Sequence, residues 1–261
     1  MDSAWSQQAS QLLNNDVISA EQFFQLATTD EESGPVQLRM LLGYAQRLPR
    51  PQQDPVWHEL AAKHLPELVT KFRSDDSGPL TPTARVINVI SYTPYFIRFL
   101  STPPARSPSL ASLYTHRVSQ HSQSLSASSN PDDVAETCQF LATLLLVQGT
   151  DDIQKQDKDS LLPVLRQWVK RPAFRGRLAS DASERVVWLL TGDRSMAQPL
   201  SMVRNHLIAP LEKCSAQGCS KTRANGDLMK CSRCKSALFC TKDHQKLAWG
   251  AHKRICFEPV F

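Results

Sequence analysis

The fold of the C-terminal region is decided by one stretch, 214-CSAQGCSKTRANGDLMKCSRCKSALFCTKDHQKLAWGAHKRIC-256. The stretch holds six of the seven cysteines of the chain, together with two histidines. These eight soft ligands form four close pairs: Cys214 with Cys219, Cys231 with Cys234, Cys240 with His244, and His252 with Cys256. Eight such ligands satisfy two tetrahedral zinc ions and leave none over, so the sequence predicts two structural zinc sites.

The spacing within the pairs supports metal binding but leaves open how the pairs combine. Two residues separate Cys231 from Cys234, which lets both sulfurs face one ion. The last two pairs have i,i+4 spacing, which places both members of each pair on one face of a helix. The pairs can combine in sequence or alternately. Asn225-Gly226-Asp227 is a tight-turn signal, so a short hairpin is expected between the first two pairs.

The part of this stretch from Cys231 to Cys256 resembles the MYND zinc finger. Phe239 matches the aromatic residue before the family's fifth ligand, and Gln245 matches the glutamine after its sixth. Trp249 matches the family's tryptophan, and His252-Lys-Arg-Ile-Cys256 matches its H-K-x-x-C ending. The whole stretch covers about 43 of the 261 residues, so the resemblance says nothing about the rest of the chain.

The resemblance implies alternating ligation of two structural Zn²⁺ ions. The first ion would be held by Cys214, Cys219, Cys240 and His244. The second would be held by Cys231, Cys234, His252 and Cys256. One ligand departs from the family, in which the residue at the position of His244 is usually cysteine. Because zinc accepts either residue, both sites are expected to be Cys3His.

The resemblance also implies a function. MYND fingers bind short proline-containing peptides in corepressors and adaptors, which predicts a non-catalytic interaction adaptor in transcriptional or regulatory complexes. Ser236, Gln245 and Trp249 are the candidate peptide-binding residues. An alternative is a protein related to SET-domain lysine methyltransferases, but Asn205-His206 is the only fragment that resembles a SET motif. In a third hypothesis the helical region is the scaffold and the finger is only a structural appendage.

Charge and targeting signals restrict the class of protein further. Residues 213–256 carry ten Lys and Arg against two Asp, whereas the rest of the chain carries 20 basic and 23 acidic residues. The basic finger is interpreted either as a solvated face or as a surface for acidic partners, and nucleic acid is not favoured because no base-reading helix is evident. Without a signal peptide or a long apolar run, an intracellular protein of the cytoplasm or nucleus is expected, with no membrane association.

The residues before the finger predict an all-α fold. The prediction is an irregular or solenoid-like helical domain over residues 1–208, which begins with a short helix over 3–14 and is followed by the finger over 213–257. Asn130-Pro131 is the clearest helix start, since an N-cap residue precedes a proline in the first turn. Asp54-Pro55 predicts another start by the same rule, and Pro66 is expected to break or kink the helix that follows.

Overall fold

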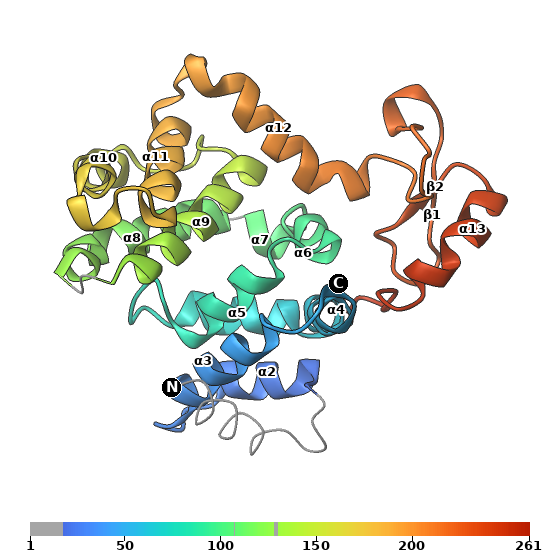
Figure 1. Cartoon of the computed structure of the whole chain (residues 1–261), viewed down its shortest axis with the longest axis horizontal. Coiled ribbons are helices and arrows are strands. Elements are labelled where there is room, and N and C mark those ends of the chain that lie inside the picture. The colour runs from blue at the N-terminus through green and yellow to red at the C-terminus, as the bar shows by residue number, and fades with distance from the viewer. Residues whose placement is uncertain (1–17, 107, 128–129) are drawn as a thin grey trace. The chain divides into compact units, whose positions relative to one another are not determined.

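The computed structural model describes residues 18–106, 108–127 and 130–261, so the helix predicted over 3–14 lies outside the described residues (Figure 1). The predicted fold class, an all-α region followed by a small finger, is confirmed. The α-helices are α2 (Ala20–Thr28), α3 (Gly34–Ala45), α4 (Arg50–Ser74), α5 (Pro82–Ile90), α6 (Pro94–Phe99), α7 (Pro103–Arg106), α8 (Leu110–Ala127), α9 (Pro131–Gln148), α10 (Lys155–Lys170), α11 (Leu178–Thr191), α12 (Ala197–Ile208) and α13 (Lys242–His252). Short 3-10 helices are η2 (Pro172–Phe174), η3 (Arg194–Met196), η4 (Ala209–Leu211) and η5 (Arg223–Asn225). No helix within the described ranges is long and apolar enough to cross a membrane.

The chain folds into two compact units that do not follow the order of the sequence. The first unit comprises the described part of Met1–Phe72, with Thr81–Arg98 and Ala209–Phe261. The second unit comprises Arg73–Leu80 and Phe99–Ile208. The finger is thus grouped with the N-terminal helices in the first unit. The division of the chain at 208/213 was predicted from motifs, and it remains a proposal about which segments fold independently.

The second unit is built around α8 to α11. Helix α8 packs on α9 and α10, while α11 packs on α9 and α10, which is the contact pattern of two stacked helical hairpins. The predicted start of α9 is confirmed, because the Asn130 side chain accepts a hydrogen bond from the Asp132 N–H at 3.1 Å and Pro131 occupies the first turn. Its other end is closed by Gly149 at φ 85°, a backbone conformation that favours glycine. Large buried side chains fill this unit, including Phe140, Leu161, Leu165 and Trp168.

In the first unit, α2 packs against α3 and α5. A capping box starts α2, since Ser19 and Gln22 satisfy each other's backbone N–H groups. Phe23 of α2 is fully buried and packs on Trp57 of α4, with ring centroids 4.7 Å apart. This apolar contact holds α4 against the N-terminal helices.

Helix α4 differs from the prediction. It begins at Arg50 rather than after Asp54, and it runs through both Pro55 and Pro66 without ending. A proline inside a helix costs about 3 kcal/mol because it removes one backbone hydrogen bond. The buried face of α4 offsets this cost; it consists of Val56, Trp57, Leu60, Ala61, Ala62, Leu65, Leu68, Val69 and Phe72.

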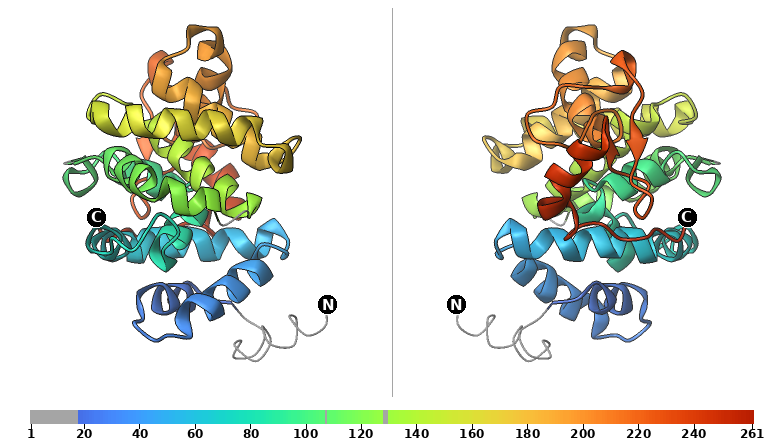
Figure 2. Two further views of the ribbon diagram at one scale, coloured as in Figure 1. Left: turned by 90° about the vertical axis from the view of Figure 1, so that its left-hand side faces the viewer. Right: turned by 90° about the vertical axis from the view of Figure 1, so that its right-hand side faces the viewer.

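The two prolines also leave two carbonyl groups without their helical partners. Pro55 cannot donate to the Pro51 carbonyl, and Pro66 cannot donate to the Ala62 carbonyl, since each lies four residues earlier. Both carbonyls accept hydrogen bonds from the C-terminal end of the chain instead. Arg254 Nη2 donates to Pro51 O at 2.7 Å, and the Val260 N–H donates to Ala62 O at 3.1 Å. Figure 2 shows the C-terminal segment running along α4.

Replacement of Pro66 by alanine tests this use of the freed carbonyl. The new residue would supply the missing N–H and remove the ring that pushes the Ala62 carbonyl away from the helix axis. We expect amide hydrogen exchange of Val260 to become about fivefold faster, since one hydrogen bond is worth about 1 kcal/mol. Pro163→Ala in α10, a helix-internal proline of the second unit, is the matched control and should leave Val260 unchanged. Unchanged exchange of Val260 in Pro66→Ala would contradict the role given to this carbonyl.

Candidate metal centre

The structure brings the eight predicted ligands into two clusters. Within each cluster the ligand atoms all lie within 4.8 Å of one another. The first cluster contains Cys214, Cys219, Cys240 and His244. The second contains Cys231, Cys234, His252 and Cys256. The pairs therefore alternate along the chain, as the family resemblance implies, and all seven cysteines of the chain are free of disulfides.

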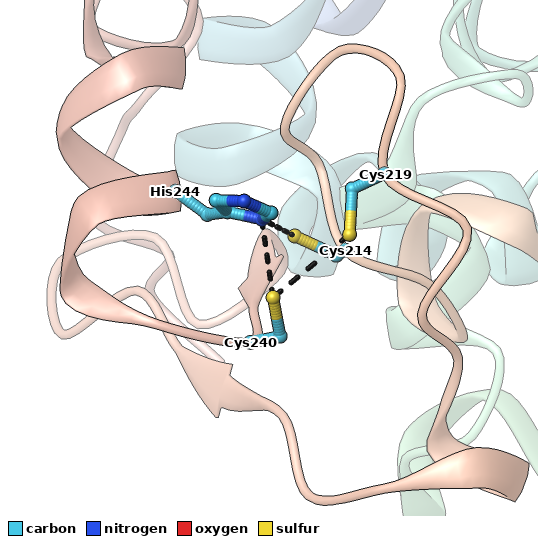
Figure 3. Close-up of side chains that lie close together, drawn as sticks. All are labelled: Cys214, Cys219, Cys240 and His244. Carbon is cyan, nitrogen blue, oxygen red and sulfur yellow. Dashed lines mark hydrogen bonds between the residues drawn. The ribbon is translucent and has the colours of Figure 1, made fainter.

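The first cluster has the dimensions of a tetrahedral zinc site. The three sulfurs and the ring nitrogen of His244 converge on one point (Figure 3). Zinc–ligand distances of about 2.3 Å to sulfur and about 2.0 Å to nitrogen require roughly 3.8 Å between two sulfurs and roughly 3.5 Å between sulfur and nitrogen. The Sγ atoms of Cys219 and Cys240 are 3.8 Å apart, and Cys214 Sγ lies 3.6 Å from His244 Nδ1. Cys240 Sγ is closer to that nitrogen, at 3.1 Å.

The second cluster has the same dimensions and is fully buried. The Sγ atoms of Cys231 and Cys256 are 3.7 Å apart. His252 points its Nε2 at the cluster, 3.7 Å from Cys234 Sγ and 3.4 Å from Cys231 Sγ. The two sites thus use different ring nitrogens, Nδ1 of His244 and Nε2 of His252. Both clusters fit zinc with four protein ligands, which is the arrangement of structural sites.

The surroundings of the thiols support metal binding. Burial opposes ionisation of Cys214, but hydrogen bonds from the backbone of Ala216 and Cys240 lower the pKa of its thiol to about 6. Burial and the charges of Cys234 and Cys231 raise the pKa of Cys256 to about 12. Three thiolates crowded into one buried site repel one another, and a divalent cation removes that repulsion by binding them.

Residues 213–256 match the family model of the MYND finger. The C-terminal region is a MYND finger. Over 30 residues, which are 12% of this chain, the sequence is 47% identical to Egl nine homolog 1 of Homo sapiens. The match covers only 7% of that protein, so the chain spans a small part of the curated relative's length. No solved structure matches the chain.

The ligands of the MYND finger are positioned by a small hairpin and one helix. Strands β1 (Met229–Lys230) and β2 (Leu238–Phe239) pair antiparallel around the Cys231–Cys234 knuckle. The hairpin predicted at 225–227 is wrong in place, because η5 ends at Asn225 and the paired strands begin only at Met229. Helix α13 begins at the N-cap Thr241, whose side chain accepts from the His244 N–H at 3.1 Å. His244 and His252 lie two turns apart on α13, so the two zinc sites fix both ends of this helix.

A buried tyrosine joins the MYND finger to the helices of the first unit. The hydroxyl of Tyr95 in α6 lies 3.0 Å from the Ile255 carbonyl and 2.9 Å from the Phe257 carbonyl, and it accepts from the Phe257 N–H at 2.8 Å. These groups flank the zinc ligand Cys256. Burial raises the pKa of Tyr95, so its hydroxyl keeps its proton and remains a donor.

Arg98 makes a second connection from the same helix. Its guanidinium donates to the carbonyl of the zinc ligand Cys234 at 3.2 Å and to the Phe261 carbonyl at 3.0 Å. The same group lies 5.3 Å from the centroid of the Phe261 ring. No sequence pattern marks Tyr95 or Arg98, because their partners are backbone atoms more than a hundred residues away.

The three predicted peptide-binding residues differ in how exposed they are to solvent. Ser236 is 3% exposed, and its hydroxyl donates to the Cys234 carbonyl at 3.1 Å, which closes the knuckle. Gln245 and Trp249 lie one turn apart on α13 and are more accessible. Trp249 is 44% exposed, with its ring centroid 5.9 Å from that of His252. Gln245 and Trp249 therefore share a face, whereas Ser236 is part of the scaffold.

Proposed function

We propose that the chain is a non-catalytic adaptor whose MYND finger recognises short proline-containing peptide segments in transcriptional or regulatory complexes. A MYND finger is a zinc-binding interaction domain, and the peptide class is the part that we add. The observation that carries the proposal is the exposed Trp249 on α13, a helix fixed by zinc ligands at both ends. A rigid exposed aromatic ring suits recognition, because little side-chain entropy is lost when a peptide binds.

The neighbouring groups complete the proposed peptide surface. The amide of Gln245, one turn before Trp249, can donate and accept hydrogen bonds with a peptide backbone. Ser236 contributes indirectly, since its bond to the Cys234 carbonyl keeps the knuckle in shape. A proline-rich segment is already extended in solution, so it pays a small entropic cost on docking against an aromatic ring.

The alternative hypotheses receive no comparable support. Asn205 and His206, the fragment that resembles a SET motif, lie exposed within helix α12, and the Asn205 amide donates to Ser201 of the same helix at 3.5 Å. We therefore extend the non-catalytic assignment from the MYND finger to the whole chain as part of the proposal. The thiolate-rich finger suits a reducing compartment, the cytoplasm or the nucleus.

Substitution of Trp249 by Ala tests the proposed surface. We expect binding of proline-containing peptides to weaken at least about tenfold, since an aromatic anchor at the centre of an interface is worth about 2 kcal/mol or more. The free energy of unfolding should change by less than about 1 kcal/mol, because the ring is half exposed. Binding would be measured by fluorescence anisotropy on a proline-containing peptide array, with zinc content as the control for folding. Equal binding by Trp249→Ala, or no enrichment of proline in the bound peptides, would contradict the proposal.

A further inference from the structure

A hollow of ≈ 520 Å³ opens within the first unit, between the MYND finger and the N-terminal helices. Its size falls in the range of about 300–1,000 Å³ that is usual for ligand sites. One wall is α13, and the opposite wall comes from α4 and α6. The lining residues are His58, Pro94, Tyr95, Pro210, Ser215, Gln217, Cys234, Ser236, Ala237, Leu247, Ala248, Ala251, His252 and Ile255.

The hollow is lined by other residues of α13 than Gln245 and Trp249, the exposed residues of the proposed proline-peptide surface. Leu247, Ala251 and Ile255 recur every four residues and line it, whereas Gln245 and Trp249 do not. At about 100° per residue, the Leu247–Ala251 face is turned by more than about 120° from Trp249. The small side chains of Ala248 and Ala251 leave the space that a larger residue would fill. The MYND finger therefore borders a concave surface that is completed by residues outside the finger.

The walls of the hollow are mainly apolar. Leu247 is 70% exposed at the hollow, an unusual exposure for a large aliphatic side chain. Pro94 and the ring of Tyr95 face it from α6, and Tyr95 is held in place by its hydrogen bonds to Ile255 and Phe257. Such a surface accepts an aliphatic side chain of a partner, because burial there removes apolar area from water on both sides.

Basic residues outnumber acidic ones beside the hollow. Among the described residues that line it, none is Asp or Glu. Lys235 and Lys253 are exposed and adjoin the lining residues Ser236 and His252 in the sequence. Glu59, which adjoins the lining residue His58, is paired with Lys63. The finger as a whole carries ten basic residues and two acidic ones between 213 and 256. Charge complementarity therefore favours an acidic partner.

We propose that this hollow is a docking site for an acidic peptide segment of a partner protein, one aliphatic side chain of which inserts between α13 and Tyr95. The lysines beside the hollow attract the acidic residues on either side of that aliphatic anchor. The site uses Leu247 and Ala251 rather than Gln245 and Trp249, so it does not depend on the side chains of Gln245 and Trp249. The helical region then contributes to recognition, since His58, Pro94 and Tyr95 form part of the wall.

The test is a binding array on the full-length protein. Peptides carry a central Leu or Gly, flanked on both sides by Glu, Gln or Lys, with the remaining positions randomised and without proline. We expect binding to be strongest for Leu flanked by Glu, at least about tenfold weaker when Gly replaces Leu, and weaker at higher salt. Equal binding of Glu-flanked and Lys-flanked peptides, or of Leu and Gly peptides, would overturn the proposal.

Variants of α13 locate the site. Ala251→Phe fills the hollow and should weaken binding of the Leu–Glu peptides at least about tenfold. Gly250→Phe is the matched control, because a side chain at Gly250 meets nothing within 4 Å and residue 250 does not line the hollow. Leu247→Ser, at a highly exposed position, gives the same test if Ala251→Phe fails to retain its zinc. Unchanged binding in Leu247→Ser and Ala251→Phe would overturn the assignment.

The same set separates the two proposals. Trp249→Ala should still bind the Leu–Glu peptides and should no longer bind the proline-containing ones. Ala251→Phe should bind the proline-containing peptides and should no longer bind the Leu–Glu peptides. Loss of both peptide classes in Trp249→Ala would mean that only one surface binds and would overturn the second site. If Trp249→Ala still binds both peptide classes, the proposed proline-peptide surface is contradicted and the hollow is not.

Discussion

Removal of zinc with a chelator will unfold residues 213–257 while most of the helical content before them remains. Metal binding supplies about 10–16 kcal/mol in structural zinc sites of this kind, and the finger has few large apolar residues to replace it. Hydrogen exchange followed by mass spectrometry should show loss of protection across the finger. The effect should be reversed by added zinc.

The loss of protection should extend to α6 and to the part of α4 that carries the two freed carbonyls. Tyr95 and Arg98 bind backbone groups beside the ligands of the second zinc site. These hydrogen bonds should be lost when the zinc is removed and the segment unfolds. The hairpins of the second unit, α8 to α11, serve as an internal control and should keep their protection. Unchanged exchange in residues 213–257 after zinc removal would refute the structural role of the metal.

Replacement of Tyr95 by Phe will destabilise the first unit by about 2–4 kcal/mol, because it leaves buried carbonyls and an N–H without a partner. The residue is 2% exposed, and its hydroxyl lies within hydrogen-bond distance of the Ile255 and Phe257 backbones. The measurement is the free energy of unfolding by urea, together with the exchange rate of the Phe257 N–H. Faster exchange at the Phe257 N–H distinguishes the loss of its hydrogen bond to Tyr95 from a general loss of stability.

Tyr44→Phe is a suitable control for this prediction. Tyr44 belongs to α3 of the same unit, is only half-buried, and no hydrogen bond to its hydroxyl is seen among the described residues. Its replacement should change the free energy of unfolding by less than about 0.5 kcal/mol. An equal effect of the two substitutions would show that the hydroxyl of Tyr95 does not hold the finger.

The finger was predictable from the sequence because its chemistry is local. The spacing of eight ligands required two tetrahedral sites, and the residues around Gln245 and Trp249 indicated the family. The pairing of the clusters followed from that resemblance and not from spacing alone. The hairpin was misplaced because Asn225-Gly226-Asp227 is a strong turn signal, yet the two strands pair across the knuckle that follows it.

The ends of the helices were predictable from the sequence where local capping signals determine them. They were not predictable where the packing of distant residues determines them. Asn130 caps α9 as expected, since the cap forms within four residues. Pro55 was predicted to start a helix and Pro66 to break or kink it, but α4 begins earlier, at Arg50, and continues through both prolines. Its buried face and the hydrogen bonds from Arg254 and Val260 stabilise this continuous helix. Tyr95 and Arg98 could not be found at all, because a side chain that binds distant backbone leaves no periodic pattern. The hollow beside α13 was not predicted either, because its lining residues come from segments far apart in the sequence.

The most direct test of the account is the zinc content of a double variant, Cys214→Ser with Cys240→Ser, measured by native mass spectrometry. In the structure both residues belong to the first cluster, whereas sequential pairing would place one in each site. The unmodified chain is expected to hold two zinc ions, and the double variant is expected to keep one. Loss of both ions from the double variant, or retention of both, would contradict the interleaved zinc sites on which the MYND finger and its two proposed binding surfaces depend.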